Sequence, residues 1–89
     1  MSDNVEFITD ESLFLRCVLE EVHRAREKDP SCNGLMCALT EGVGEVAKAI
    51  IDDPWDTVFQ DCVQVATLAL RVAIEGDPTL NVVRRFNDE

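Results

Sequence analysis

Residues 62–74 read CVQVATLALRVAI, and this stretch decides the fold class. Wound as a helix, it is apolar on almost every side. Its polar interruptions are Gln64, Thr67 and Arg71. A helix that is apolar all round is covered by neighbouring helices or by another subunit. We therefore expect a central helix that starts at Asp53-Pro54 and stops at Gly76, a residue suited to the position just past a helix end.

Two further segments have the periodicity of amphipathic helices. The first runs from Thr9 or Asp10 to Glu27. Its apolar face consists of Phe14, Val18, Val22 and Ala25, widened by Leu15 and Leu19. The second runs from about Ser31 to Ile51. Its principal apolar stripe is Met36, Leu39, Val43, Ala47 and Ile50.

Each of the three prolines follows an aspartate, and an aspartate before proline is a helix-start signal. Asp29-Pro30 more simply ends the first helix and leads to the second. Asp77-Pro78 predicts a short fourth helix that continues through Val82, Val83 and Phe86. No strand pattern competes, so the expected fold is an all-α helical bundle with three main helices. It forms a single domain over residues 1–89, with residues 1–8 and 87–89 expected to fray.

Composition argues against several classes of partner. The chain has 18 Asp and Glu against 8 Lys and Arg, a net charge of -10. This balance disfavours binding to nucleic-acid phosphates and to an anionic membrane surface. The longest apolar run is shorter than a bilayer requires. A metal ion held by carboxylates would still allow the chain to bind a polyphosphate.

Cysteine usage points to a reduced compartment. The chain has four cysteines without a CxxC pair and one histidine, so the sequence does not support a zinc site. The amino terminus lacks the basic and apolar regions of a signal peptide. We expect reduced thiols in a cytoplasmic protein, with most of the cysteines acting as small apolar residues.

The second predicted helix has another flank made of small residues, namely Ala38, Gly42 and Ala49. A glycine inside a helix costs about 1 kcal/mol relative to alanine, and close approach of another helix would compensate for this cost. If this helix and the next are antiparallel, Glu45 and Asp61 come near each other. Two carboxylates from adjacent helices can form a Mg²⁺ site. The spacing alone favours a hydrogen-bonded polar layer that fixes the register of the two helices, and the metal site is the alternative.

Residues 38–50 read ALTEGVGEVAKAI, and this stretch resembles the second helix of the MazG-like nucleoside triphosphate pyrophosphohydrolases, A-L-x-E-E-V-G-E-L-A-x-A-I. Residues 61–70 are similar in outline to the family's E-x-x-D-V segment, and the resemblance extends over about residues 22–80. It implies a helical bundle that forms dimers or tetramers and holds Mg²⁺ and a nucleotide between helices. It also implies hydrolysis between the α and β phosphates to a monophosphate and pyrophosphate.

The family's metal ligands form an E-x-x-E pair and an E-x-x-D pair. The first pair falls on Gly42, which has no ligating side chain, and on Glu45. In the preferred register the second pair falls on Asp61 and Gln64, and in an alternative register it falls on Val58 and Asp61. With Glu41 one turn before Glu45, the candidate metal ligands are Glu41, Glu45, Asp61 and Gln64, and the candidate phosphate contacts are Lys48 and Arg71. The resemblance leaves two alternatives, an active pyrophosphohydrolase or a degenerate scaffold that binds a nucleotide or a protein without hydrolysis.

Overall fold

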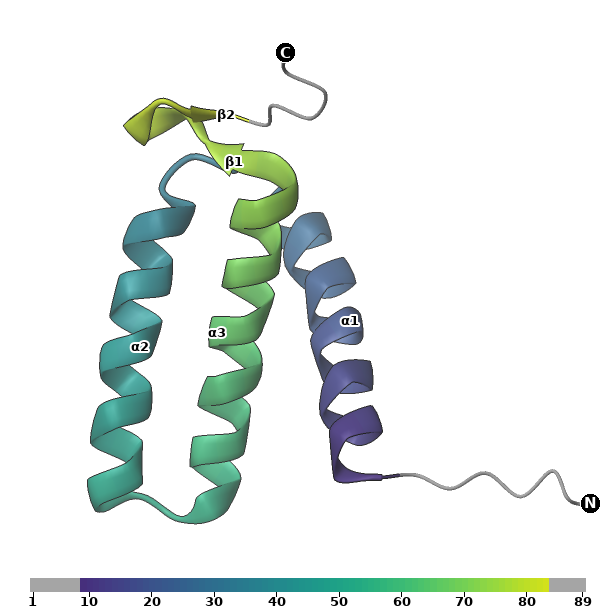
Figure 1. Ribbon diagram of the computed structural model, residues 1–89, viewed down its shortest axis with the longest axis vertical. Helices are drawn as coiled ribbons and strands as arrows, with labels where there is room; N and C mark the ends of the chain where they lie inside the picture. The colour runs from purple at the N-terminus through teal and green to yellow at the C-terminus, as the bar shows by residue number, and fades with distance from the viewer. Residues whose placement is uncertain (1–8, 84–89) are drawn as a thin grey trace, which may run out of the picture.

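The computed structural model describes residues 9–83, which form three long helices and a small hairpin (Figure 1). The helices are α1 (Asp10–Lys28), α2 (Leu35–Asp52) and α3 (Trp55–Glu75). They are followed by strand β1 (Gly76–Asp77), a 3-10 turn (Pro78–Leu80) and strand β2 (Val82–Val83). The all-α fold class is confirmed. The expected fraying of the two ends and the expected position of Phe86 lie outside the described residues.

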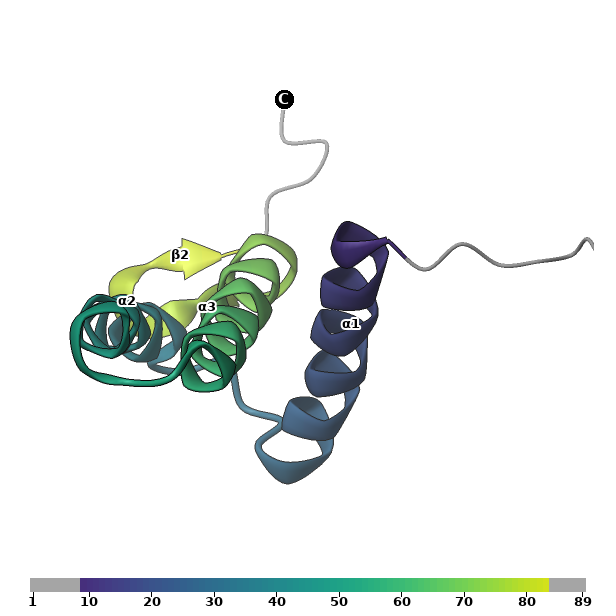
Figure 2. The ribbon, with the colours of Figure 1, turned by 90° about the horizontal axis from the view of Figure 1, so that it is seen from below.

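Helix α3 is the central helix, as its sequence predicts. It lies between α2 and α1 in both views, antiparallel to α2 and in the same direction as α1 (Figures 1 and 2). The buried cluster between α1 and α3 consists of Val18, Val22 and Val63. Phe14 and Phe59 extend it with an edge-to-face contact at a centroid distance of 5.5 Å. Apolar burial of this kind holds α1 on α3.

Helix boundaries follow local signals in two of the three helices. The Thr9 hydroxyl accepts a hydrogen bond from the Ser12 N–H at 3.0 Å and so caps α1, and α3 ends at Gly76 as expected. Helix α2 begins at Leu35, and the expected start at Ser31 is wrong. The reason is Gly34, whose φ of 83° lies in the left-handed region and interrupts the helical backbone before Leu35.

Asp77 supplies the cap that α2 lacks in its own sequence. Its side chain is fully buried and accepts hydrogen bonds from the N–H groups of Gly34 at 3.0 Å and Met36 at 2.8 Å. It also accepts from the Thr79 N–H at 3.1 Å and the Thr79 hydroxyl at 2.7 Å. These donors, the Met36 N–H foremost, lower the pKa of Asp77 to about 2. By contrast, the start of α3 at Pro54 has no side-chain cap, so the expected role of Asp53 is wrong.

The fourth helix predicted after Asp77-Pro78 is also wrong, as is the expected absence of strands. Between Asp77 and the end of the described residues at Val83, only the turn Pro78–Leu80 is helical. Asn81 then takes a left-handed φ of 59° and reverses the chain, so that β2 pairs antiparallel with β1 in the register Gly76 to Val83. Because the chain reverses at Asn81, Val82 and Val83 belong to a strand and not to the helix that their apolar character suggests.

The face of α2 that packs on α3 differs from the predicted apolar stripe. The buried residues are Leu35, Gly42 and Ala49, whereas Val43 and Ile50 are 54% and 58% exposed. Small side chains let two helix backbones approach closely, so the small flank turns inward and the larger stripe is displaced to the side. Leu15 and Leu19, the expected extension of the α1 face, are exposed as well.

Helix α3 is long and apolar enough to cross a membrane by length and composition alone. The sequence predicts that the longest apolar run is too short to span a bilayer, but the whole of α3, with its few polar residues included, is long enough. This is weak evidence for a membrane span, because core helices of bundles meet the same criterion.

Candidate functional site

The site is built on the close packing of α2 against α3. A Cβ atom placed on Gly42 would lie 3.1 Å from Cγ2 of Val65 and 3.9 Å from Cδ1 of Leu68. Gly42 is buried in this contact, and Ala49 on the same flank is 1% exposed. The flank of small residues therefore packs on a neighbouring helix as predicted, and this packing offsets the helix-propensity cost of a glycine.

The contact between Gly42 and Val65 fixes the register of the two carboxylates. Glu45 lies one turn after Gly42 in α2, and Asp61 lies one turn before Val65 in α3. Because the helices are antiparallel, both steps lead in the same direction along the pair (Figure 1). At 100° per residue, Glu45 is rotated about 60° from Gly42 and Asp61 about 40° from Val65, towards the same side of the pair. The two carboxylates thus share one level and one side.

The other candidate ligands lie further from this position. Glu41 and Lys48 are exposed on α2 and are rotated about 100° and 120° from Gly42 in the same sense as Glu45. Gln64 is exposed on α3. Within residues 9–83, no group of three or more histidine, cysteine, aspartate or glutamate side chains is placed to share a metal ion. Helical geometry therefore places Glu45 and Asp61 on one side of the α2–α3 pair, and their convergence on a metal ion stays a prediction.

Arg71 has a defined role in the fold. It is 2% exposed, and its Nη2 donates to Oε1 of Glu75 at 2.8 Å and to the carbonyl oxygen of Ser31 at 3.2 Å. Glu75 also accepts a hydrogen bond from Nε of Arg26 at 2.7 Å. The hydrogen bond from Arg71, followed by that from Arg26, lowers the pKa of Glu75. The cluster of Arg71, Glu75 and Arg26 links α3 to α1 and to the loop before α2. The sequence did not predict this cluster, although Arg71 and Glu75 are one turn apart.

A cleft of about 400 Å³, here called the polar cleft, opens between α1, α3 and the start of α2. Its polar lining includes Glu21, Arg24, Lys28, Asn33, Gln64 and Arg71. Hydrogen bonds from Arg24 and, more weakly, from Gln64 lower the pKa of Glu21. The apolar floor includes Leu35 and Leu68. The spacing of residues within α1 does not predict this cleft, because only the fold brings Glu21, Arg24 and Lys28 opposite Gln64 and Arg71.

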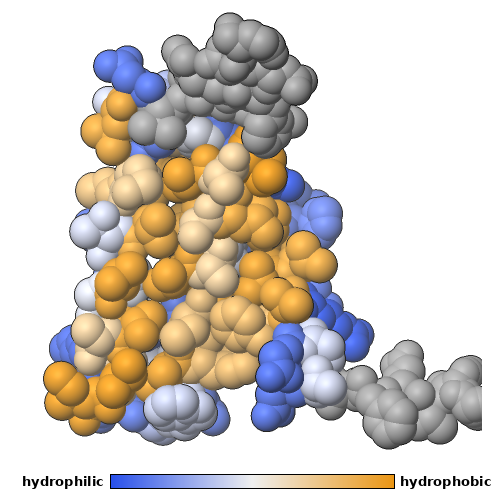
Figure 3. All heavy atoms as spheres, in the orientation of Figure 1, coloured by the Kyte–Doolittle hydropathy of each residue, from blue (hydrophilic) through white to orange (hydrophobic). Residues whose placement is uncertain are grey.

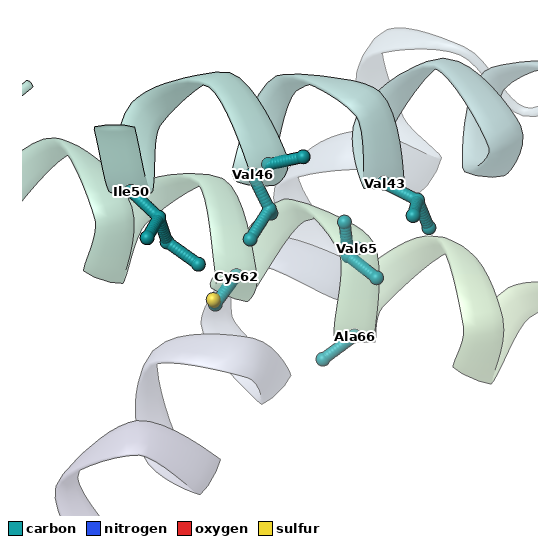
Figure 4. A pocket seen from close by; sticks show the side chains of 7 residues that line it. Val43, Val46, Ile50, Cys62, Val65 and Ala66 are labelled. Atoms are coloured by element: carbon teal, nitrogen blue, oxygen red, sulfur yellow. The ribbon is translucent and has the colours of Figure 1, made fainter. Parts of the chain in front are cut away.

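A second cavity lies on the other side of the α2–α3 pair. This apolar groove has a volume of about 410 Å³ and is lined by Val43, Val46, Ala47, Ile50, Cys62, Val65 and Ala66, none of them charged (Figure 4). Val43 and Cys62 are rotated from the contact between Gly42 and Val65 in the sense opposite to Glu45 and Asp61. The α2–α3 pair therefore has one apolar side and one side that carries carboxylates.

All four cysteines are free thiols, and Cys37 is the exposed one among them.

Comparison of the chain with protein-family models, with curated proteins and with solved structures found no match in any of the three. The function of the chain is therefore inferred from its own residues and their arrangement.

Proposed function

We propose that the chain is a MazG-like nucleoside triphosphate pyrophosphohydrolase that works as a homo-oligomer in the cytoplasm and uses Mg²⁺. The observation that carries this proposal is the shared level and side of Glu45 and Asp61 on the antiparallel helices α2 and α3. Of the four positions at which the MazG-like pattern has a metal ligand, these two retain a carboxylate in this sequence.

The donor set fits a magnesium ion that arrives with its nucleotide. In such complexes Mg²⁺ is held by one or two protein carboxylates together with substrate phosphates and water. Glu45 and Asp61 supply the two carboxylates, with Glu41 and Gln64 as neighbouring oxygen donors. When bound, the metal neutralises phosphate charge and activates water for attack. Lys48 is exposed on the same side of α2 as Glu45, where its ammonium group can contact a phosphate.

The polar cleft offers room for the nucleoside part of the substrate. A volume of about 400 Å³ lies within the range of small-molecule sites, roughly 300–1,000 Å³. Its apolar floor can contact the face of a base, while Asn33 and Gln64 present amide groups that both donate and accept hydrogen bonds. Gln64 belongs to the cleft and lies one turn from Asp61, so the cleft and the carboxylate pair adjoin along α3.

The test is release of pyrophosphate from the standard dNTPs and NTPs in the presence of Mg²⁺ or Mn²⁺. We expect Glu45→Gln to lower kcat/KM by at least about 100-fold, because it removes the charge of one of two carboxylates. Glu20→Gln is the matched control, since Glu20 is exposed on α1 and pairs with Arg16. Absence of turnover with every nucleotide, or equal activity of the two variants, would refute the proposed hydrolysis.

A second candidate function is a degenerate MazG-like scaffold that binds a nucleotide without cleaving it. The observation that favours it is the burial of Gly42 against Val65, which leaves neither a ligand nor room for one at that position. Calorimetric titration with Mg²⁺ and dATP separates the two functions. Binding that Glu45→Gln abolishes, with no release of pyrophosphate, would establish the scaffold; absence of both binding and release would exclude both candidates.

A further inference from the structure

The turn before α2 contains the dipeptide Asn33-Gly34. Asparagine followed by glycine is chemically labile, because the side-chain carbonyl carbon lies within reach of the next backbone nitrogen and glycine has no side chain to obstruct the approach. Asn33 is exposed, and a Cβ atom added to Gly34 would meet nothing within 4 Å other than its chain neighbours. The surroundings therefore leave room for the two groups to react.

We propose that Asn33 is a site of spontaneous deamidation, and that the Asp77 carboxylate restrains this reaction in the folded chain. The Gly34 nitrogen loses its proton and attacks Cγ of Asn33. The bond from Cγ to the side-chain nitrogen breaks, and this nitrogen takes up the proton and leaves as ammonia. Water then opens the cyclic succinimide at Cγ to give aspartate, or at the backbone carbonyl carbon to give isoaspartate. The proposal is independent of nucleotide hydrolysis.

The Asp77 carboxylate opposes the first step, the loss of the Gly34 proton. Oδ1 of Asp77 accepts a hydrogen bond from this N–H at 3.0 Å, and Asp77 is fully buried. An amide anion at Gly34 would therefore face a negative charge at close range in a place shielded from water. Because its hydrogen bonds lower the pKa of Asp77 to about 2, the carboxylate is also too weak a base to take the proton itself.

Hydrogen bonds on both sides of the dipeptide also hold the turn in place. The Met36 N–H donates to Oδ2 of Asp77 at 2.8 Å, and the Asn33 N–H donates to the Ser31 hydroxyl oxygen at 3.1 Å. The hairpin that carries Asp77 lies at the start of α2 (Figure 1). Attack moves the Gly34 nitrogen towards Cγ of Asn33 and strains these bonds, so folding slows the reaction in addition to the effect of charge.

Asn81 is the internal comparison, since it is exposed and also lies in a turn. The next residue is Val82, whose branched side chain crowds the nitrogen that would have to attack. Val82 also belongs to β2 and pairs with Asp77 of β1. We therefore expect Asn81 to stay intact under conditions in which Asn33 reacts.

The new charge enters the polar cleft, because Asn33 lines it. The apolar groove shares no lining residue with the polar cleft, and apolar residues cover α2 and α3 on the side shown in Figure 3. Deamidation therefore changes the charge of the cleft and leaves the groove unchanged.

The two products differ in their effect on the start of α2. Isoaspartate lengthens the backbone by a methylene group before Gly34, which shifts the N–H groups of Gly34 and Met36 relative to Asp77. Aspartate keeps the backbone and adds a negative charge that the N-terminus of α2 favours. The isoaspartate form should therefore have a lower urea midpoint than the unmodified chain, and the aspartate form should not.

Peptide mapping by mass spectrometry follows the reaction in a mildly alkaline buffer, with one sample folded and one unfolded in guanidinium chloride. We expect the mass increase of deamidation at Asn33 in both. The rate should be at least about 10-fold lower in the folded chain, since each unit by which the Gly34 N–H becomes less acidic lowers the population of its anion about tenfold. Electron-transfer fragmentation distinguishes isoaspartate from aspartate. Asn33→Gln, which keeps an amide but requires a larger ring, should abolish the signal.

Asp77→Asn tests the restraint, because it keeps the size of the side chain and removes its charge. The introduced asparagine precedes Pro78, which has no N–H and so cannot react in the same way. In the folded chain the variant should speed the loss of the Asn33 amide by about 10-fold, and in guanidinium chloride it should have no effect. Val63→Ala is the matched control, since it weakens the core between α1 and α3 without touching the turn.

Three outcomes would overturn the proposal. An Asn33 that stays intact in guanidinium chloride, or an Asn81 that reacts as fast, would remove the site. Equal rates in the folded and unfolded samples would remove the restraint, and this comparison needs no variant. Equal acceleration by Val63→Ala and Asp77→Asn would show that unfolding, and not the charge of Asp77, controls the rate.

Discussion

Replacing Gly42 and Gly44 by alanine, one at a time, isolates the packing energy of the α2–α3 contact. Both glycines lie in the middle of α2, two residues apart, so the gain in helix propensity is the same for both. An added methyl group at Gly42 would lie 3.1 Å from Cγ2 of Val65, whereas at Gly44 nothing lies within 4 Å. The two substitutions therefore differ only in what the new methyl group meets.

The magnitudes predict opposite outcomes. Gly44→Ala should raise the free energy of unfolding by about 1 kcal/mol, the propensity difference between the two residues. At Gly42 the same gain is opposed by overpacking that costs about 1–3 kcal/mol, because valine in a helix has one favoured rotamer and cannot easily turn aside. The net effect of Gly42→Ala is then a change between about zero and a loss of 2 kcal/mol.

Urea unfolding followed by circular dichroism measures both variants at one protein concentration, so that self-association affects them equally. Val65→Ala supplies a second test, because it removes the atom that the new methyl group meets. In that background Gly42→Ala should recover most of the stabilisation seen at Gly44, and the double-mutant cycle gives the coupling energy. Equal stabilisation by Gly42→Ala and Gly44→Ala in the wild-type background would refute the close contact.

Three further substitutions test other parts of the fold. Thr67→Val should stabilise the chain by about 1 kcal/mol, because the buried Thr67 hydroxyl has no hydrogen-bond partner within the described residues; Thr40→Val, whose hydroxyl is exposed and bonded to Met36, should not. The pKa of Asp77 is lowered from 3.8 to about 2 in the folded chain, so its carboxylate stabilises the fold fully above about pH 4 and this stabilisation is lost as the pH falls towards 2. The urea midpoint of the wild-type chain should therefore fall over this pH range, and Asp77→Asn should not show this part of the decrease. Glu75→Gln should cost about 3 kcal/mol in urea unfolding, since it leaves the buried Arg71 without its anion.

Much of the candidate site could be predicted from spacing. Once two helices are joined by a short connection, Glu45 and Asp61 fall at one level, because each is one turn from the residues that make the contact. The polar cleft could not be predicted in this way. Its α1 residues Glu21, Arg24 and Lys28 read as solvated in an isolated helix, and only packing against α3 places them opposite Gln64.

The role of Asp77 was also beyond local inference. The sequence predicts a cap within its own turn, and Asp77 does accept from Thr79. Its bonds to Gly34 and Met36 join residues more than 40 positions apart, and they replace the cap that the start of α2 does not contain. Burial then makes these bonds matter, because the carboxylate has no water to replace them.

The sequence by itself determined the three helices, most of their ends and the central position of α3. These properties depend on periodicity, capping and composition within a few residues, which act in the same way in any tertiary context. Only the tertiary structure decided that α2 turns Gly42 and Ala49 inward and leaves Val43 and Ile50 uncovered. Which face of a helix is buried depends on the volumes that both partners bring to the contact, and Gly42 facing Val65 allows a closer approach than a larger side chain does.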